Sequence, residues 1–352
     1  MARKQYTGPA VHLPALFYIS RIQSDSEGST MDLQYLLFLQ QLRTTSCSWL
    51  TPVMMLISHL AVNGSLIICV AVFWGTNREL GYWLISNCLS GLLFNNTLKL
   101  TACIYRPWIR CPELVPPSGA IKGATGYSFP SGHTQIAGSF FGSIAARYGK
   151  EKKGLAVFCV AMILLTAFSR NFLGVHTPQD VLAAMASSAV IVFANVKLFE
   201  KLRNDPSLLP KAIAVGCVAA VLCILYFALK SYPMDYVDGA LVVDPAEMKE
   251  DGYAAAGATL GALIGAFLET RYVKFSTDGT IPLKIMRVLM GIPAAALIML
   301  VVRKPVYDLI GRPAGHVVIY FAVGIYIIFL YPAIFTAIHR RRLQSHETPA
   351  QD

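Results

Sequence analysis

The sequence predicts an all-α, polytopic membrane protein with about nine transmembrane helices. Of its 352 residues, 55% are hydrophobic and only 14% are charged. A soluble domain of this size needs more charge to cover its surface. The apolar residues also fall in blocks near the roughly 20 residues that a helix needs to cross about 30 Å of hydrocarbon. Composition and block length therefore indicate the same fold class.

Nine apolar blocks are the expected spans. Eight of them run about 51–74, 80–99, 154–169, 181–199, 211–230, 253–269, 285–302 and 316–338. A ninth, about 133–149, is less apolar and rich in small residues. In the block 253–269, Gly257, Gly261 and Gly265 recur every fourth residue, a spacing typical of close packing between helices.

The segment before the first span is expected to lie at the membrane surface. Residues 1–30 are polar and lack the apolar core of a signal peptide. They are either part of the protein or an upstream extension, with Met31 as the true start. From Met31 the chain reads MDLQYLLFLQQLR, and four apolar residues share one helical face: Tyr35, Phe38, Leu39 and Leu42. This pattern predicts an interfacial amphipathic helix.

Two connecting segments are expected to be loops. Residues 231–252 are acidic and contain Pro, Gly and Asp, which favour turns. Residues 303–316 read RKPVYDLIGRPAGH and are interpreted as an interfacial loop, or else as a contact for a polar headgroup.

Loop charges predict the orientation of the chain. With nine spans, the two faces carry 14 and 16 of the 30 Lys and Arg residues. Five cations on the first face cluster around the motifs described below, which explains them by chemistry: Lys99, Arg106, Arg110, Lys122 and Arg170. Without these five, the first face carries 9 Lys and Arg residues and the second face 16. By the positive-inside rule, the second face is then cytoplasmic. The N-terminus and the motifs are expected outside, the C-terminus inside, and the plasma membrane is the expected location. The net charge of +10 therefore does not indicate nucleic-acid binding.

The first motif lies at the outer end of the second span. Lys99 and Arg106 are separated by about two helical turns, and Pro107 then turns the chain. Two cations so placed could bind an anion, or they could be cations that extend to the membrane interface.

The second motif, GYSFPSGH, leads into the span at 133–149. Ser131 is placed to cap that helix, so that the free N–H groups of Gly132 and His133 would face an anion. The alternative is an ordinary helix cap followed by an interfacial histidine.

The third motif, SRNFLGVHTPQD, links the fourth and fifth spans and contains Arg170 and His176. Thr177 is an expected N-cap and Asp180 the acidic member of a capping box. That role alone would explain Asp180, but its carboxylate could also hold the imidazole of His176 in one tautomer. Together the motifs supply three cations, two histidines and a carboxylate on one face, the parts that phosphoryl transfer needs.

These motifs resemble the type 2 phosphatidic acid phosphatase superfamily, whose signature is K-x6-R-P, then P-S-G-H, then S-R-x5-H-x3-D. The chain matches all three over about residues 50–200, including Pro130 and Ser169. The resemblance implies that His176 attacks phosphorus, Asp180 orients it and His133 protonates the leaving group. It also implies phosphate binding by Lys99, Arg106, Ser131, Gly132 and Arg170. Neither a metal nor another cofactor is implied, and the eight cysteines show no C-x-x-C zinc spacing.

The resemblance predicts a phosphoric monoester hydrolase of the histidine-nucleophile acid phosphatase type. Residues 51–204 are its expected catalytic core, after a tail at 1–50 and before accessory helices at 205–352. Because the GYSFPSGHT context is similar to bacterial lipid phosphatases, the expected substrate is a membrane lipid, phosphatidic acid-like or a prenyl pyrophosphate. The nine-span layout is similar to glucose-6-phosphatase, so a sugar phosphate is the alternative. A transporter or scramblase with a vestigial site is a third hypothesis. No oligomeric state is predicted.

Overall fold

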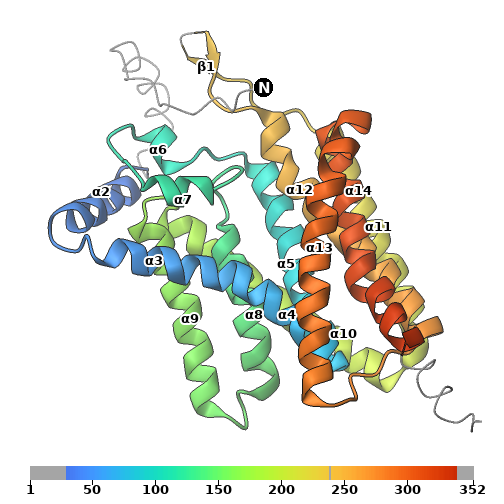
Figure 1. Cartoon of the computed structure of the whole chain (residues 1–352). Helices are drawn as coiled ribbons and strands as arrows, with labels where there is room; N and C mark the ends of the chain where they lie inside the picture. The colour runs from blue at the N-terminus through green and yellow to red at the C-terminus, as the bar shows by residue number, and fades with distance from the viewer. Residues whose placement is uncertain (1–28, 238, 339–352) are drawn as a thin grey trace, which may run out of the picture.

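The computed structural model describes residues 29–237 and 239–338, and these are almost entirely helical (Figure 1). The chain begins with α2 (Ser29–Thr45), which packs beside α9. Its buried face differs from the predicted apolar one: it consists of Asp32, Leu36, Leu39 and Arg43, while Phe38 is exposed. The helix was predicted, but its face was not, because two charged side chains find partners in the fold.

The first half of the protein contains the helices that carry the motifs. In chain order they are α3 (Leu50–His59), the π-helical turn η1 (Leu60–Gly64), α4 (Ser65–Gly75), α5 (Arg78–Ala102), α6 (Pro107–Arg110), α7 (Ser118–Lys122), α8 (Gly132–Tyr148), α9 (Lys153–Phe172) and α10 (Pro178–Asn204). The first three run on as one long helix, which crosses α9 and α8 obliquely before it reaches α5 (Figure 1).

The second half adds four long helices and one hairpin. They are the 3-10 turn η2 (Pro206–Leu208), α11 (Leu209–Leu229), β1 (Tyr236–Val237), β2 (Ala240–Leu241), α12 (Pro245–Leu268), the π-helical turn η3 (Glu269–Val273), α13 (Ile281–Ile310), α14 (Arg312–Ile325) and the π-helical turn η4 (Tyr326–Leu330). The strands pair antiparallel, with Tyr236 opposite Leu241.

Helices occur at all nine predicted blocks, and seven of them are long and apolar enough to cross a membrane. The seven are Leu50–Gly75, Lys153–Phe172, Pro178–Asn204, Pro206–Leu229, Pro245–Val273, Ile281–Ile310 and Arg312–Ile338. The protein is thus an all-α polytopic membrane protein. The other two, α5 and α8, are helical but fall outside these seven, and both carry many polar residues that are buried among their neighbours.

The two segments expected to be loops are shorter than predicted. Within 231–252, the hairpin replaces part of the loop, and α12 already begins at Pro245, capped by Asp244, whose carboxylate accepts the N–H of Ala246. Within 303–316, α13 continues to Ile310 and α14 starts at Arg312, so Gly311 (φ 78°) alone breaks the helix. The ends of α12, α13 and α14 in these segments lie near the protein surface and are therefore polar. Their polar sequence was for that reason interpreted as loop.

Close packing joins α12 to α14, as the spaced glycines predict. A Cβ atom at Gly257 would lie 2.4 Å from the carbonyl oxygen of Val317, and one at Gly261 would lie 2.1 Å from that of Phe321. Such contacts are too short for any side chain, so the two backbones touch along this seam.

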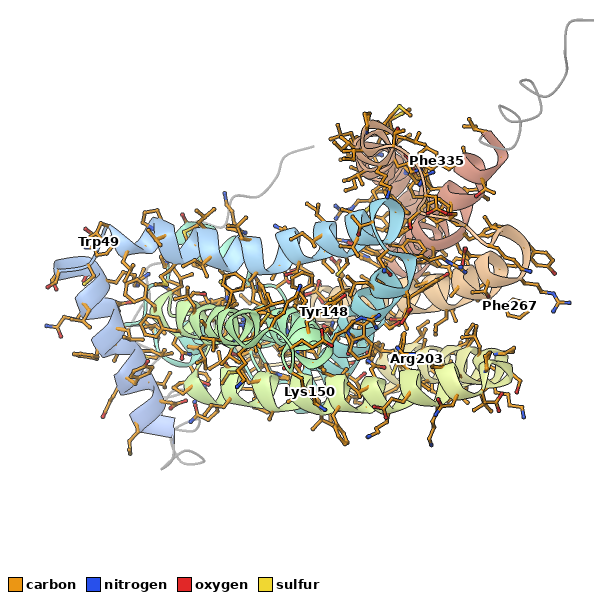
Figure 2. The ribbon with its side chains drawn as sticks, turned by 90° about the horizontal axis from the view of Figure 1, so that it is seen from below. Trp49, Tyr148, Lys150, Arg203, Phe267 and Phe335 are labelled. Carbon is orange, nitrogen blue, oxygen red and sulfur yellow. The ribbon has the colours of Figure 1, made fainter. Side chains whose placement is uncertain are left out.

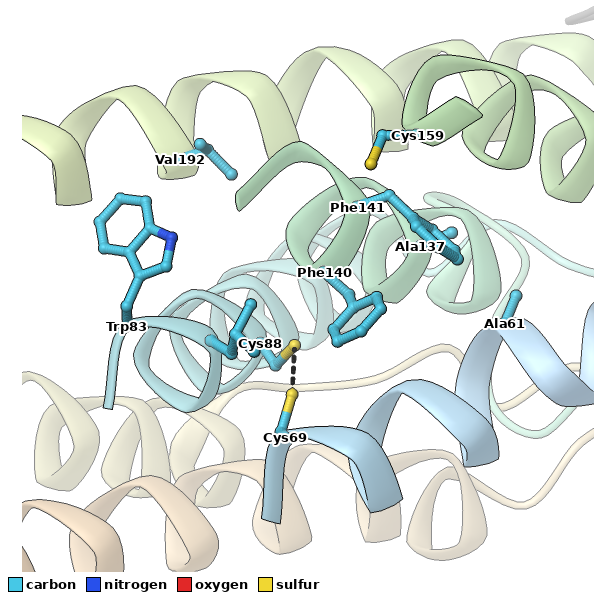
Figure 3. Close-up of a cluster of buried hydrophobic side chains, with 10 residues drawn as sticks. Ala61, Cys69, Trp83, Cys88, Ala137, Phe140, Phe141, Cys159 and Val192 are labelled. Carbon is cyan, nitrogen blue, oxygen red and sulfur yellow. Dashed lines mark hydrogen bonds between the residues drawn. The ribbon is translucent and has the colours of Figure 1, made fainter. Parts of the chain in front are cut away.

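A mostly apolar core fills the space between α4, α5, α8, α9 and α10 (Figure 3). Trp83, Phe140 and Phe141 are its largest members, and the thiols of Cys69 and Cys88 meet at 3.9 Å. This core fixes the relative positions of the helices whose ends carry the motifs.

One end of the bundle is marked by basic residues. Arg147, at the end of α8, and Arg203, at the end of α10, both pair with Glu79 at the start of α5, at 3.1 and 3.2 Å. Lys150 lies in the turn that joins the end of α8 to the start of α9, and Figure 2 views the molecule from this end. We call this the basic end. The motifs lie at the other end, which we call the motif end.

Candidate active site

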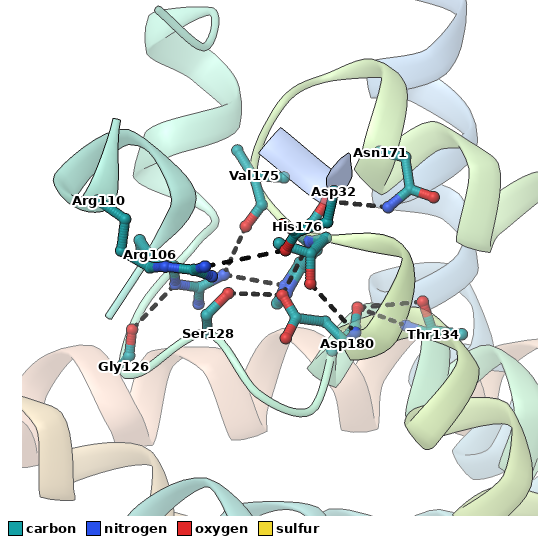
Figure 4. Close-up of polar contacts among 12 residues, drawn as sticks. Asp32, Arg106, Arg110, Gly126, Ser128, Thr134, Asn171, Val175, His176 and Asp180 are labelled. Carbon is teal, nitrogen blue, oxygen red and sulfur yellow. Dashed lines mark hydrogen bonds and ion pairs between the residues drawn. The ribbon is translucent and has the colours of Figure 1, made fainter. Parts of the chain in front are cut away.

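The motif end brings the three motifs together from four helix ends. These are the end of α5, the start of α8, the end of α9 and the start of α10 (Figure 4). The backbone N–H of Ser131 donates to the carbonyl of Asp180 at 3.0 Å, which ties the second motif to the third. Lys99, Arg106, Arg170, His176 and Asp180 are all buried.

His176 is held by a carboxylate on one side and faces a guanidinium on the other. Its Nδ1 lies 3.2 Å from Asp180 Oδ2, and its Nε2 lies 2.9 Å from Arg106 Nη1 (Figure 4). Arg106 can only donate, so Nε2 must be the acceptor and Nδ1 carries the proton. The carbonyl of His176 also accepts from Asn171 Nδ2 at 2.9 Å. The lone pair of Nε2 therefore points at the guanidinium of Arg106.

Asp180 both caps the start of α10 and contacts the imidazole of His176. Its Oδ2 accepts the backbone N–H of Thr177 at 2.9 Å, while Thr177 Oγ1 accepts the N–H of Asp180 at 3.4 Å, which completes the predicted capping box. The same Oδ2 accepts the hydroxyl of Ser128 at 2.6 Å. A carboxylate fixed by a helix cap is thus also the partner of His176.

Arg106 is held by backbone carbonyls and by His176, and its guanidinium lies 5.7 Å from the centre of the Trp108 ring. Its Nε donates to Gly126 at 3.0 Å, its Nη1 to Val175 at 3.1 Å, and its Nη2 to Thr125. The plane of the guanidinium is therefore fixed by two loops, one before α8 and one before α10.

Arg170 and Lys99 both have hydrogen-bond donors that make no bond to the described residues. Arg170 Nη1 donates to Ser58 Oγ at 2.7 Å, but its Nε and Nη2 have no partner among the described residues and are shielded from solvent. No hydrogen bond of the Lys99 ammonium joins it to the described chain, and that group lies 3.9 Å from where a Cβ of Gly132 would stand. A buried N–H without a partner costs about 1–3 kcal/mol, so two on one side chain indicate room for a ligand.

The start of α8 supplies the remaining predicted groups. Ser131 Oγ accepts the N–H of Thr134 at 3.4 Å, as expected for an N-cap. Gly132 and His133 form the first helical turn, and His133 is half-buried. Its Nε2 lies 4.0 Å from where a Cβ of Gly123 would stand, so the loop after α7 covers it.

Burial and positive neighbours control protonation of the site. Burial, reinforced by the Arg106 guanidinium, lowers the pKa of His176 from 6.5 to about 3, although Asp180 acts in the opposite direction. Burial likewise lowers the pKa of Arg106 to about 10, opposed by the carboxylates of Asp180 and Asp251. At neutral pH, His176 is therefore neutral and Arg106 is charged.

Four residues that support the site were missed by sequence reasoning. Ser128 holds Asp180, the carbonyls of Thr125 and Gly126 hold Arg106, and Asp251 of α12 accepts the hydroxyl of Thr125 at 2.6 Å. Ser128 lies within the second motif, so its hydroxyl was a visible signal. Asp251 was not, because a contact across 126 residues leaves no trace in local spacing.

Two family models match the chain. One, described as PAP2 superfamily, matches residues 79–204, and the other, described as PAP2 superfamily phosphatase, transmembrane extension, matches residues 253–343. The first range contains every motif residue discussed above.

Several curated proteins are similar to part of the chain. Phosphatidylglycerophosphatase B of Bacillus subtilis (strain 168) is 27% identical over 44% of this chain and 76% of its own length. Undecaprenyl-diphosphatase BcrC of the same strain is 29% identical over 44% of this chain and 78% of its own length. Lipid A 1-phosphatase of Rhizobium johnstonii is 34% identical, over 22% of this chain and only 33% of its own length.

One solved structure is also similar to the chain. It is the crystal structure of a transmembrane PAP2-type phosphatidylglycerolphosphate phosphatase from Bacillus subtilis. It is 21% identical, with a TM-score of 0.40, and the match covers 54% of this chain and 96% of that chain.

Proposed function

The chain belongs to the PAP2 superfamily, and from that membership and its site we propose that it hydrolyses the phosphate ester or pyrophosphate of a membrane lipid. It is an integral membrane phosphatase, a phosphoric monoester hydrolase. Three relatives of this family named above act on phosphorylated membrane lipids, as their names state.

One observation carries this proposal: a neutral, oriented histidine faces cations that have donors to spare. His176 Nε2 has a lone pair directed at Arg106, and Arg170 keeps two N–H groups unused. A phosphate dianion needs such donors on its oxygens and a nucleophile in line with its leaving group. Arg106 Nη1 contacts the nucleophilic Nε2 of His176 at 2.9 Å, and an arriving phosphate would draw that guanidinium onto its own oxygens.

The proposed reaction has two steps. In the first, Nε2 of His176 bonds to phosphorus, the bond to the leaving oxygen breaks, and His133 gives that oxygen its proton. Asp180 stabilises the positive charge that the imidazole acquires. In the second step, His133 accepts a proton from water, the water oxygen bonds to phosphorus, and the phosphorus–nitrogen bond breaks. Lys99, Arg106 and Arg170 would hold the phosphate oxygens, together with Ser131 and the N–H of Gly132.

The side chains near the site favour a lipid over a soluble sugar phosphate. A sugar needs several directed hydrogen bonds, and four amides are near enough in sequence to provide them: Asn95, Asn96, Asn171 and Gln179. Asn171 is engaged with His176, Asn96 donates to the carbonyl of Leu92, and Gln179 is exposed. Asn95, which is buried with an unpartnered Nδ2, and the exposed Gln179 therefore remain, and two amides are too few for a sugar with several hydroxyls.

The orientation remains part of the proposal. The basic end, which gathers Arg147, Lys150 and Arg203, would be cytoplasmic by the positive-inside rule. The motif end would then open outside, in the plasma membrane, and the substrate would come from the outer leaflet. We further propose that residues 51–204 are the catalytic core and that the helices from 205 are accessory to it.

Phosphate release from a panel of substrates tests this function. The purified protein in detergent is given phosphatidic acid, phosphatidylglycerophosphate, undecaprenyl diphosphate and glucose 6-phosphate. We expect release from at least one lipid with kcat/KM at least about tenfold above that for the sugar phosphate. Equal or faster hydrolysis of glucose 6-phosphate would contradict the lipid assignment, and no release from any of the four would contradict the phosphatase.

A further inference from the structure

Helix α12 brings a carboxylate of the accessory half to the motif end. Asp251 Oδ2 accepts the hydroxyl of Thr125 at 2.6 Å, in the loop between α7 and α8. The next residue, Gly126, shows how close this carboxylate is to the cations. A Cβ atom there would lie 3.8 Å from Asp251 Oδ2 and equally 3.8 Å from Lys99 Nζ. Thr125 is exposed, Gly126 is buried and Asp251 is half-buried, so Asp251 lies between the buried cations and the surface of the protein.

The same two loop residues hold the central guanidinium of the site. The carbonyls of Thr125 and Gly126 accept from Arg106 Nη2 and Nε, respectively. One residue, Thr125, thus binds Asp251 with its side chain and Arg106 with its backbone. A single residue, Thr125, therefore connects α12 to Arg106.

Asp251 also changes the charge balance of the site. Lys99, Arg106 and Arg170 are three buried cations, and Asp180, the carboxylate beside His176, is already engaged by His176, Ser128 and Thr177. The negative charge of Asp251 reduces the mutual repulsion of these cations. The pKa of Arg106 reflects this, since Asp251 opposes the lowering caused by burial. Once phosphate is bound, the same charge repels it.

We propose that Asp251 is a positioning residue that also sets the affinity of the site for phosphate. Through Thr125 it fixes the loop that holds Arg106, and by its charge it prevents the three cations from retaining inorganic phosphate, the product of the reaction. This inference rests on the proposed phosphatase function. It assigns a task to the accessory half, whose transmembrane extension begins two residues after Asp251 in the family match.

Two substitutions separate the two parts of this role. Asp251→Asn removes the charge but keeps an oxygen that can accept from Thr125, so phosphate should bind about threefold to tenfold more tightly. Thr125→Val keeps the charge but removes the hydrogen bond, so Arg106 loses support and phosphate should bind more weakly. A purely structural role for Asp251 predicts that both variants weaken binding.

Glu250→Gln is the matched control. Glu250 precedes Asp251 on the same helix, but its carboxylate pairs with Arg312 at 2.8 Å and lies 3.6 Å from His316 Nε2. The substitution makes the same change in charge one residue away and should leave phosphate affinity within about twofold of the wild type.

The test is titration calorimetry with orthophosphate on the full-length protein in detergent, for the wild type and the three variants. We expect tighter binding by Asp251→Asn, weaker binding by Thr125→Val and no change in Glu250→Gln. Unchanged or weaker binding by Asp251→Asn would overturn the inference, as would an equal gain in Glu250→Gln. If Asp251→Asn does not fold, Asp251→Glu serves instead: it keeps the charge and must keep affinity within about twofold. Absence of phosphate binding in both the wild type and Asp251→Asn would also overturn the inference, whereas absence of substrate hydrolysis by the wild type would contradict the phosphatase function.

Discussion

Buried charge occurs at both ends of the bundle, in two different arrangements. At the basic end, Glu269 is fully buried, and its Oε2 accepts from Arg78 Nε and Nη2 and from the hydroxyl of Tyr82. Its Oε1 accepts the N–H of Phe275 at 2.7 Å. At the motif end, Arg170 is as deeply buried but leaves Nε and Nη2 without partners.

The difference separates a structural ion pair from a binding site. A buried charge whose hydrogen bonds are all made is costly to disrupt and offers nothing to a ligand. A buried charge with unused donors costs stability, and a fold retains that cost where a ligand compensates it. Substitutions at the motif end should therefore change activity, whereas those at the basic end should change stability.

The largest expected effect is at the nucleophile. His176→Ala should lower kcat by at least about 10³-fold, because the described site offers no other nucleophile in contact with Arg106. The matched control is His316→Gln, which removes another buried histidine, one that bonds Tyr307 and the carbonyl of Arg312. It should keep kcat within about threefold. Comparable losses in both variants would erase the distinction between the two kinds of buried group.

A second pair compares the arginines directly. Arg170→Lys keeps the charge but loses the planar fork, so kcat/KM should fall about 100-fold with little change in Tm. Arg78→Lys at the basic end should lower Tm and leave kcat/KM within about twofold. Steady-state kinetics and thermal unfolding in detergent measure both. A fall in Tm without a loss of activity in Arg170→Lys would mean that Arg170 is structural.

Glu269→Gln should affect stability alone. Removing the charge of Glu269 leaves Arg78 without its counter-ion. The side chain of Arg78 is 31% exposed, so water partly solvates its charge. The expected cost is therefore about 2 kcal/mol, at the low end for a buried pair. Tm should fall while kcat/KM of the folded protein stays the same, and a specific loss of kcat would show that the two ends are coupled.

The smallest expected effect is on the pH dependence of stability. His176 has a folded pKa of about 3 against 6.5 when unfolded, so between these values the unfolded state binds more protons. Its contribution to stability is present above pH 6.5 and is lost as the pH falls toward 3. Tm should thus fall less between pH 7 and pH 5 in His176→Asn than in the wild type. Parallel Tm curves for the two proteins would contradict the buried, neutral imidazole.

The sequence predicted what depends on local spacing. The nine helix positions, the capping box of Thr177 and Asp180 and the packing of Gly257 and Gly261 all follow from patterns within a few residues. The predicted apolar face of α2 was wrong, because its buried residues are set by contacts with other helices. The start of α12 at Pro245 was missed, because that segment was interpreted as a loop. Asp251 was missed because its contact with Thr125 spans 126 residues. The expected membrane orientation and the roles of the site residues stay predictions. The alternative start at Met31 concerns residues 1–30, and nearly all of these lie outside the residues that the structure describes.

The central claim is that His176 carries the phosphate during turnover, and trapping that intermediate tests it most directly. Wild-type protein and His176→Ala are mixed with a phosphate-labelled lipid substrate that the wild type hydrolyses. Both are then denatured at alkaline pH, and peptides are analysed by mass spectrometry. We expect one phosphate on the wild-type peptide that contains His176 and none on the variant. Phosphate on a different residue, or full turnover with no phosphorylated peptide, would contradict it.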